Sequence, residues 1–317
     1  MATAAWVVAV GLLVAGVVLT SARLVQPAGR FGILLVALTP LGLVAYGLAT
    51  LVLGAMLLAA PVLGLWALAV VAVGGLVVHA RWLAPLVAGA GPAPAADARR
   101  LVVMTANLAQ RDGDPAALVR LAGAERVDLL VVEEILPEAL AAMDDVGLAG
   151  LLPHRLGEPL AGAAGTMVFA RSPLTLVAPL ATTQEGWVAR VDGLVVVAAH
   201  PQAPTLPADW HADQAALLAA VHEHAPDLVL GDLNATTDHA SLRRLARSGH
   251  RDVVELTNGG WQPTWPAGRR WAVLGSALPV ARIDHVLAGP RMAALSTRTV
   301  ALPGSDHRAV VATVAVR

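Results

Sequence analysis

The sequence predicts a membrane region of three helices, followed by an α/β domain in which two sheets pack together with helices outside. Two observations predict this division. Residues 1–92 hold no Asp or Glu and only three basic residues, whereas all 23 carboxylates lie beyond them. After residue 99, short apolar runs alternate with segments of helical character, which is the pattern of an α/β domain. At 317 residues, the chain has room for both parts.

Three apolar stretches predict membrane-spanning helices. They cover about Ala4–Thr20, Phe31–Leu53 and Pro61–Val78, and each approaches the roughly 20 residues that a helix needs to cross about 30 Å of hydrocarbon. A buried pair of core helices is the alternative for the last two, but a long apolar run without a charge disfavours it. We therefore expect residues 1–82 to be a membrane region, with a kink at Pro40.

Three spans place the two ends of this region on opposite sides of the bilayer. The loop after the first span carries Arg23 and Arg30, and the positive-inside rule would put that loop and the following domain in the cytoplasm. Residues 83–98, LAPLVAGAGPAPAADA, form a Pro/Ala/Gly linker of extended, semi-rigid character. The linker is expected to hold a catalytic domain at residues 99–317 close to the bilayer surface.

Capping signals and apolar runs predict the elements of that domain. Asp114-Pro115 is an N-cap followed by Pro at the first helical position, which predicts a helix through about Ala122. Further helices are expected over about Ala208–His224 and Asp238–Arg247. Runs rich in β-branched residues predict strands at Leu101–Thr105, Leu129–Val132, Thr166–Ala170, Leu194–Ala199, Leu228–Leu230, Ile283–Leu287 and Ala309–Val316.

Acidic, amide and imidazole side chains stand where these apolar runs end. Because a sheet delivers strand ends to a common rim, we expect them to converge on one site. Oxygen ligands with histidines indicate a hard-cation site that acts on phosphate, and the absence of Cys excludes a thiolate metal site or nucleophile. A turn or solvated residue is the alternative for each alone. The set is Asn107, Glu134, His200, Asp232, Asn234, Asp284, Asp306 and His307.

Local chemistry indicates roles for five of these residues. The segment DLVLGDLN runs an apolar strand into a turn, where alternation can aim Asp232 and Asn234 at one site. Imidazole titrates near neutral pH, which suits His307 as a general base, and Asp284 could orient that ring by accepting its other proton. His200 ends another strand and could donate to a phosphoryl oxygen. A structural, packed histidine is the alternative for both rings.

The order and spacing of six features resemble the endonuclease/exonuclease/phosphatase superfamily and its deoxyribonuclease I-like fold. These features are TANL, VVEEI, the strand-ending His200, GDLN, RIDHVL and GSDH. The resemblance covers about Arg100–Arg317, and GDLN with a terminal SDH is a specific pairing. It implies a four-layered α/β sandwich, with two central mixed sheets flanked by helices. It also implies Mg²⁺- or Mn²⁺-dependent hydrolysis of phosphoester or phosphoanhydride bonds.

The resemblance implies a metal site and a catalytic site. Glu134 would be the principal metal ligand, with Asn107 beside it and Asp306 completing the shell. One carboxylate departs from the family's pattern, since Glu133 stands where Gln is usual. It would either tighten metal binding or face away, because adjacent strand residues point to opposite sides.

In the catalytic site that the resemblance implies, Asp232 would position or deprotonate the attacking water and Asn234 would hold the phosphate. His307, oriented by Asp284, would be a base or would stabilise the transition state, as would His200. Whether Asp232 or His307 takes the proton stays open.

Three spans followed by a linker resemble a membrane-anchored bacterial branch of the superfamily that includes accessory proteins of vancomycin and teicoplanin resistance. This implies a phosphohydrolase acting on a lipid-linked, polyprenyl pyrophosphate of cell-wall metabolism. The bilayer would be a partner as well as an anchor, because tethering raises the effective concentration of a substrate confined to it. The resemblance implies an extracytoplasmic catalytic domain in a multi-pass protein of the cell membrane. We expect the catalytic domain on the extracytoplasmic side, although Arg23 and Arg30 favour the cytoplasmic side.

Two other functions stay open. A nuclease normally shows a basic face, but three of the 22 basic and none of the 23 acidic residues lie in residues 1–92, so the rest of the chain carries a net charge of −4. A nuclease would need a local patch, such as Arg243, Arg244 and Arg247, or Arg269 and Arg270. A non-catalytic membrane module is the third reading, and the complete set of site residues argues against it.

Overall fold

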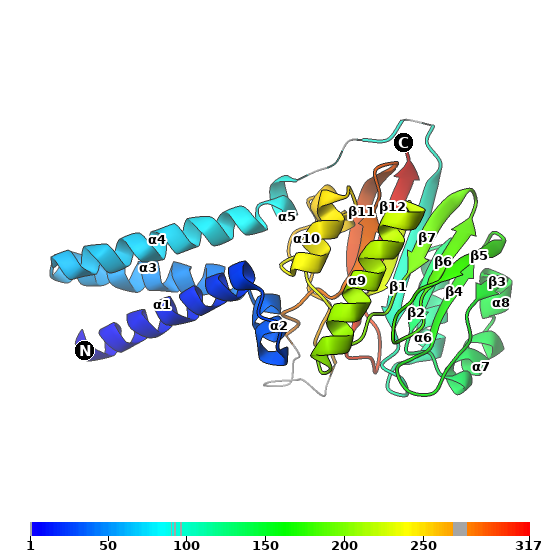
Figure 1. Cartoon of the computed structure of the whole chain (residues 1–317), viewed down its shortest axis with the longest axis horizontal. Helices are drawn as coiled ribbons and strands as arrows, with labels where there is room; N and C mark the ends of the chain where they lie inside the picture. The colour runs from blue at the N-terminus through cyan, green and yellow to red at the C-terminus, as the bar shows by residue number, and fades with distance from the viewer. Residues whose placement is uncertain (1, 90, 92, 96, 269–277) are drawn as a thin grey trace. The chain divides into compact units, whose positions relative to one another are not determined.

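The computed structural model describes residues 2–89, 91, 93–95, 97–268 and 278–317. The chain divides into two compact units, one ending at Pro85 and the other beginning at Leu86 (Figure 1). Arg269, Arg270 and the rest of the segment 269–277 lie outside the described residues.

The first unit is helical. It contains α1 (Ala2–Val25), α2 (Arg30–Ala37), α3 (Leu41–Ala59) and α4 (Leu63–Leu83). Three helices, at Thr3–Val25, Leu41–Ala59 and Leu63–Leu83, are long and apolar enough to cross a membrane, which agrees with three predicted spans. The extent of the second span was wrong, because α2 ends at Ala37 and a separate helix begins after Pro40. Proline lacks an N–H and its ring clashes with the preceding turn, so the helix ends there instead of bending.

The three long helices pack around the ring of Tyr46 in α3. A Cβ added to Gly16 of α1 or to Gly75 of α4 would lie 2.7 or 2.3 Å from that ring. The hydroxyl of Thr20 lies 3.0 Å from both the Tyr46 hydroxyl and Nε2 of His79. Close approach at small residues and interhelical hydrogen bonds stabilise helix association in lipid, where the hydrophobic effect does not. These contacts therefore hold the bundle together from within.

Two six-stranded mixed sheets form the second unit. Sheet A has the order β11-β12-β1-β2-β4-β3 and sheet B the order β5-β6-β7-β8-β10-β9. The pairs β1–β2 and β7–β8 are parallel, and the other pairs are antiparallel. The strands are β1 (Arg100–Asn107), β2 (Leu129–Glu133), β3 (His154–Leu156), β4 (Thr166–Ala170), β5 (Leu174–Pro179), β6 (Trp187–Val191), β7 (Leu194–Ala198), β8 (Leu228–Asp232), β9 (Arg251–Asp252), β10 (Asp284–Ala288), β11 (Met292–Ala301) and β12 (Arg308–Val316).

Helices flank the two sheets, as the predicted four-layered sandwich requires. On sheet A, α6 (Pro115–Ala124) and α7 (Pro137–Asp145) share a core with the outward-facing residues of β1 and β2. As predicted, α6 begins at Asp114-Pro115, and the Asp114 side chain accepts a hydrogen bond from the N–H of Ala117 at 2.9 Å.

On sheet B, α9 (Pro207–His224) lies beside α10 (Ala240–Arg247) in Figure 1. Trp210 and Gln214 tie α9 to the loop after β8, by donating to the carbonyls of Asn234 at 2.8 Å and Leu233 at 2.7 Å. The short helices are α5 (Pro85–Ala88), α8 (Leu148–Leu151) and α11 (Val253–Leu256).

The core between the sheets takes every second residue of its strands, as alternation requires. Its members include Leu101, Val103, Leu129, Val131, Leu228, Leu230, Val286 and Ala288. The same alternation continues to polar residues at one rim of the sandwich, which are Asn107 on β1, Glu133 on β2, Asp232 on β8 and Asp284 on β10. The inter-sheet core therefore sets which side chains reach the site.

The sequence pattern did not predict several of the strands. β5 and β11 expose about every other residue or more, and β3 and β9 are only three and two residues long. Such strands pair at or near the sheet edges and lack the continuous apolar run that marks the central strands. Their positions were decided by pairing and not by local composition.

Gly231, which precedes Asp232, gives the first test of this packing. Its φ is +146°, and an added Cβ would lie 1.9 Å from the carbonyl oxygen of Ala199 on the neighbouring strand segment. Gly231→Ala is expected to destabilise the domain by about 2–3 kcal/mol, measured by thermal unfolding. Gly193→Ala is the matched control, because its φ is +78° with nothing within 4 Å of the added Cβ. Equal unfolding temperatures for the two variants would contradict the close approach at Gly231.

Candidate active site

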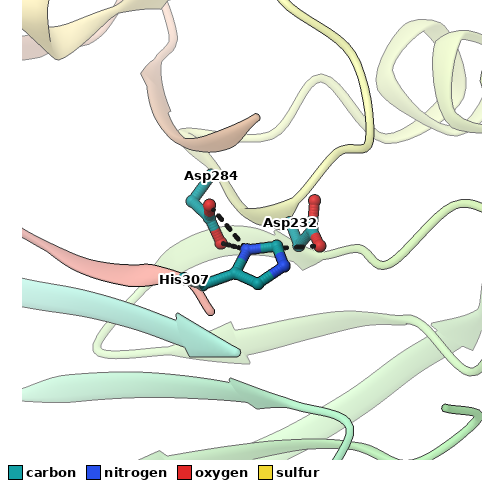
Figure 2. A group of neighbouring side chains, drawn as sticks. All are labelled: Asp232, Asp284 and His307. Carbon is teal, nitrogen blue, oxygen red and sulfur yellow. Dashed lines mark hydrogen bonds and ion pairs between the residues drawn. The ribbon is translucent and has the colours of Figure 1, made fainter. Parts of the chain in front are cut away.

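The antiparallel pair β8–β10 places two carboxylates opposite each other. Asp232 ends β8, Asp284 begins β10, and the two are partners in register. Both are buried, and the ring of His307 lies beside them (Figure 2). His307 Nδ1 is 3.0 Å from Asp284 Oδ2 and 3.7 Å from Asp232 Oδ2. One ligand atom from each of the three residues lies within 4.8 Å of the others, so they form a compact anionic cluster around one imidazole.

Two hydroxyl groups fix this cluster. Ser305 Oγ donates to the carbonyl of Asn107 at 2.8 Å and accepts from the N–H of His307 at 3.0 Å, which ties the GSDH turn to the end of β1. Thr264 Oγ1 accepts from the N–H groups of Ile283 at 3.1 Å and Asp284 at 3.2 Å. The sequence reasoning missed both. Ser305 could have been found inside GSDH, whereas Thr264 carries no sequence signal of its own.

Asn107 joins the predicted metal ligands to the cluster. Its Nδ2 donates to Glu134 Oε1 at 3.3 Å and to Asp232 Oδ2 at 3.1 Å, and its Oδ1 accepts from the N–H of Ala109 at 2.8 Å. Glu134 follows β2 with a φ of 54°, a conformation uncommon outside glycine that takes this residue out of the strand's alternation. Asp306 Oδ1 lies 3.8 Å from His307 Nε2. Burial raises the pKa of Glu134, and the charge of Asp306 adds to this shift. Among the described residues, the group whose ligand atoms lie close enough to hold one ion is Asp232, Asp284 and His307, and it contains neither Glu134 nor Asp306.

Asn234 and His200 complete the network around Asp232. The N–H of Asn234 donates to Asp232 Oδ1 at 2.9 Å, and its Nδ2 donates to the carbonyl of Pro201 at 3.0 Å. Asn234 also has a positive φ, of 47°. Nε2 of the buried His200 lies 3.8 Å from Asp232 Oδ2. Contacts thus connect all eight residues predicted for the site, Asn234 through its backbone N–H, while their individual roles stay predictions.

Burial and mutual charge set the protonation of the cluster. Burial and the charge of Asp284 raise the pKa of Asp232 to about 7. Burial by itself lowers the pKa of His307, but the charges of Asp284 and Asp232 outweigh it and raise that pKa to about 10. Burial also raises the pKa of Asp284, and the charge of His307 more than reverses this, leaving it lowered. Burial and the charge of His307 lower the pKa of His200 to about 3. At neutral pH, His307 is therefore a cation paired with Asp284, and His200 is neutral.

Glu133 does not turn away from the site. It pairs with Asn107 in the β1–β2 register, is fully buried, and its Oε1 accepts a hydrogen bond from Thr105 Oγ1 at 2.6 Å. Burial raises its pKa well above the usual range. Glu133 therefore lies on the inter-sheet face, where the charges of Asp284, Asp232 and His307 act on it, and of the two alternatives drawn from the sequence, facing away is wrong.

The family model of the endonuclease/exonuclease/phosphatase family matches residues 104–307, well over half of the chain. This match contains every residue of the connected network. The chain belongs to the endonuclease/exonuclease/phosphatase family. Enzymes of this family typically hydrolyse phosphoester bonds, which fits the charge and composition of the network.

Solved structures agree on the fold. An endonuclease/exonuclease/phosphatase family protein from Bacteroides thetaiotaomicron has 12% identity and a TM-score of 0.52, covering 70% of this chain and 99% of its own. TDP2 from D. rerio, complexed with a single-strand DNA product, has 14% identity and a TM-score of 0.54, covering 68% and 98%. An AP endonuclease from Archaeoglobus fulgidus has 15% identity and a TM-score of 0.54, covering 67% and 98%. No curated protein matches the chain. At these identities the likeness shows the fold alone.

The residues present fit the divalent metal that enzymes of this family generally use. Four carboxylates and the amide of Asn107 contribute side-chain oxygens to the connected network, and hard divalent cations take oxygen ligands of this kind. Burial is the main cause that raises the pKa values of Glu134 and Asp232, and the charges of neighbouring carboxylates add to it. A divalent cation at these oxygens would stabilise their ionised forms, so the donor set is suited to such an ion.

Asp232→Asn is expected to change the pH dependence of stability. Because the folded pKa of about 7 exceeds the ordinary 3.8, the folded protein binds this proton more tightly than the unfolded chain. The contribution of Asp232 is therefore fully present below a pH of about 4 and is lost as the pH rises through about 7.

The variant lacks that titration, so its Tm minus that of the wild type should increase between a pH of about 4 and about 8. Thermal unfolding in a chelator measures this, with Asp145→Asn at an exposed position of α7 as the control. A Tm difference that does not vary with pH would contradict the raised pKa.

Proposed function

We propose that this chain is a membrane-anchored, divalent-metal-dependent phosphohydrolase that cleaves a lipid-linked, polyprenyl pyrophosphate. The proposal rests on one observation. The same chain contains a connected site of the type found in phosphohydrolases and three helices long enough to cross a membrane. A bilayer-confined substrate meets an anchored enzyme at raised effective concentration. A soluble substrate gains nothing from the anchor.

Glu134, Asn107 and Asp306 are the residues proposed to hold the metal. Asn107 already bonds Glu134, and the charge of Asp306 acts on the same carboxylate. When bound, Mg²⁺ or Mn²⁺ neutralises charge on the phosphoryl oxygens. Mg²⁺ prefers few carboxylates with several waters, which such a set leaves room for.

Asp232 is proposed to take the proton of the attacking water. A base works best when its pKa lies near the working pH, and the pKa of Asp232 is raised to about 7. His307 holds its proton, because its pKa is raised to about 10, and Asp284 accepts a hydrogen bond from its Nδ1. Its Nε2–H is then available to a phosphoryl oxygen. This division of roles favours Asp232 as base and His307 as transition-state stabiliser.

Neutral donors complete the proposed mechanism. His200 is neutral at working pH, and its Nε2 faces Asp232 at 3.8 Å. The amide of Asn234, held over the loop by its bond to Pro201, offers its second N–H to the phosphate. Donors fixed before the reaction stabilise developing charge without reorganisation, which is the largest contribution that such side chains make.

A nuclease is the second candidate, because several structural neighbours are nucleic-acid enzymes. The 3′ phosphatase NExo from Neisseria, bound to a product DNA hairpin, has 20% identity and a TM-score of 0.53, covering 67% of this chain and 98% of its own. The charge of this chain beyond residue 92 opposes DNA binding. Within the candidate patch on α10, Arg243 already donates to the carbonyl of Asp238. A bilayer-confined substrate therefore fits the chain better than a polyanion in solution.

The catalytic unit is proposed to lie on the extracytoplasmic side, where lipid pyrophosphates of wall synthesis are released. Arg23 closes α1, Arg30 opens α2 and Arg81 lies in the last turn of α4, so all three belong to the side from which the catalytic unit follows, and this opposes the proposal. Fusions of alkaline phosphatase and green fluorescent protein to the C-terminus decide the matter. We expect the alkaline phosphatase fusion to be active and the green fluorescent protein fusion not to fluoresce. An inactive phosphatase with a fluorescent second fusion would overturn the assignment.

Hydrolysis is tested on two substrates in parallel. Phosphate release from a polyprenyl pyrophosphate in detergent and nicking of plasmid DNA are measured with Mg²⁺ for the wild type, Glu134→Gln and His307→Asn. We expect lipid turnover in the wild type and a loss of about 100- to 10,000-fold in each variant. Nicking without lipid turnover would establish the nuclease instead.

Metal binding gives an independent readout for the same variants. Mg²⁺ is expected to raise the Tm of the wild type, because a ligand that binds only the folded state stabilises it, and to leave that of Glu134→Gln unchanged. Glu138→Gln, an exposed carboxylate of α7, is the control for both assays. An equal rise in Tm with Mg²⁺ in all three proteins would show that Glu134 is not a metal ligand.

A further inference from the structure

The segment that follows the last membrane helix belongs to the catalytic unit. The N–H of Gly260 donates to the carbonyl of Leu86 at 2.9 Å, and the N–H of Gly89 donates to Asn258 Oδ1 at 2.8 Å. The N–H of Gly91 donates to the carbonyl of Leu256 at 2.9 Å. This part of the expected linker is therefore not a free spacer, since Leu86, Gly89 and Gly91 are hydrogen-bonded to the end of α11 and the loop that follows it.

This docking leaves little chain between the catalytic unit and the membrane helix. α4 ends at Leu83, and the first of these hydrogen bonds is made at Leu86. Three residues span at most about 11 Å when fully extended. The polar headgroup layer adds about 5–8 Å to each side of the hydrocarbon core. With α4 spanning a bilayer, this chain length would keep the loop at Gly260 at or next to the headgroup layer.

Two exposed apolar side chains flank the bond between Leu86 and Gly260. Val87 follows Leu86 and is 67% exposed, and Trp261 follows Gly260 and is 48% exposed. An indole so exposed is costly in water but favoured at a membrane interface, where its ring meets acyl chains and its N–H meets water or headgroups. The bilayer surface is the partner that this position and this chemistry fit.

The same loop enters the active site a few residues later. The carbonyl of Thr264 accepts a hydrogen bond from the N–H of Arg308 at 3.0 Å, and Thr264 Oγ1 holds the backbone of Asp284. Trp265 Nε1 donates to Asp306 Oδ2 at 3.3 Å. One run of nine residues, 258–266, therefore contacts the docked segment at its start, and Asp284 and Asp306 of the candidate site at its end.

We propose that Val87 and Trp261 form a membrane-contact patch that holds the loop 258–266 against the headgroup layer. The patch turns the rim of the active site toward lipid headgroups, so that the site takes the pyrophosphate of a lipid that remains in the bilayer. The contact itself stands on the docking and the exposure, and its consequence for the substrate rests on the proposed function.

The absence of Cys allows a clean test of the contact in the full-length chain. Single cysteines at Trp261→Cys, Val87→Cys and Val146→Cys are labelled with the fluorophore NBD, and each protein is reconstituted into phosphatidylethanolamine–phosphatidylglycerol vesicles. Val146 is the matched negative control, because its exposure of 48% equals that of Trp261 and it lies after α7. Val87 is the positive control, because the chain itself keeps it near the bilayer.

Quenching by spin-labelled lipids reports the depth of each label. Strong quenching is expected at positions 261 and 87, with little at 146. Quenching at 261 no greater than at 146 would overturn the contact, whatever the substrate of the enzyme.

The substrate consequence has a separate readout. Trp261→Ser is expected to lower turnover of a polyprenyl pyrophosphate embedded in vesicles by about 10-fold, while turnover of a water-soluble short-chain prenyl pyrophosphate stays unchanged. An equal loss on both substrates would overturn the coupling and make Trp261 a structural residue. If the wild type turns over neither substrate, the proposed function fails, and the quenching result still decides the contact.

Discussion

The charge balance among Asp232, Asp284 and His307 is the constraint on which the rest of the site depends. Strand pairing brings two buried carboxylates opposite each other, and such a pair is costly unless it is neutralised and hydrogen-bonded. The ring of His307 supplies the compensating cation. Ser305 binds the backbone N–H of His307, and Asp284 binds its ring. The GSDH turn and the start of β10 are therefore fixed to each other through His307.

Further buried polar contacts support the strand and the loop that carry these residues. His285 is the next residue on the same strand; its Nδ1 lies 2.5 Å from Asp252 Oδ2 and its Nε2 lies 2.8 Å from the carbonyl oxygen of Ala235. Arg282 bonds the same Asp252 carboxylate at 3.1 Å. Ala235 follows Asn234, whose left-handed backbone must be held in place by its surroundings. Strand β10 therefore carries Asp284 of the candidate site and, at the next residue, the side chain that contacts the loop at Asn234 and Ala235.

The anchor and the site are joined through the structure that surrounds this support. Asp252 caps α11 by accepting from the N–H of Val254 at 2.9 Å, and the loop after α11 binds the segment that leaves the membrane helix. The same loop then supplies Thr264 to the site. The segment that follows α4 and the candidate site therefore contact the same loop.

The sequence by itself determined what is local. Hydropathy and length marked the membrane helices, the N-cap at Asp114 marked the start of α6, and apolar runs ending in polar residues marked the central strands and the site. Only the tertiary structure decided the register that opposes Asp232 to Asp284, the inward face of Glu133, the part played by Thr264 and the hydrogen bonds of Leu86, Gly89 and Gly91. The physical reason is that burial, pairing and pKa depend on groups far away along the chain, whereas helix and strand patterns depend on neighbours.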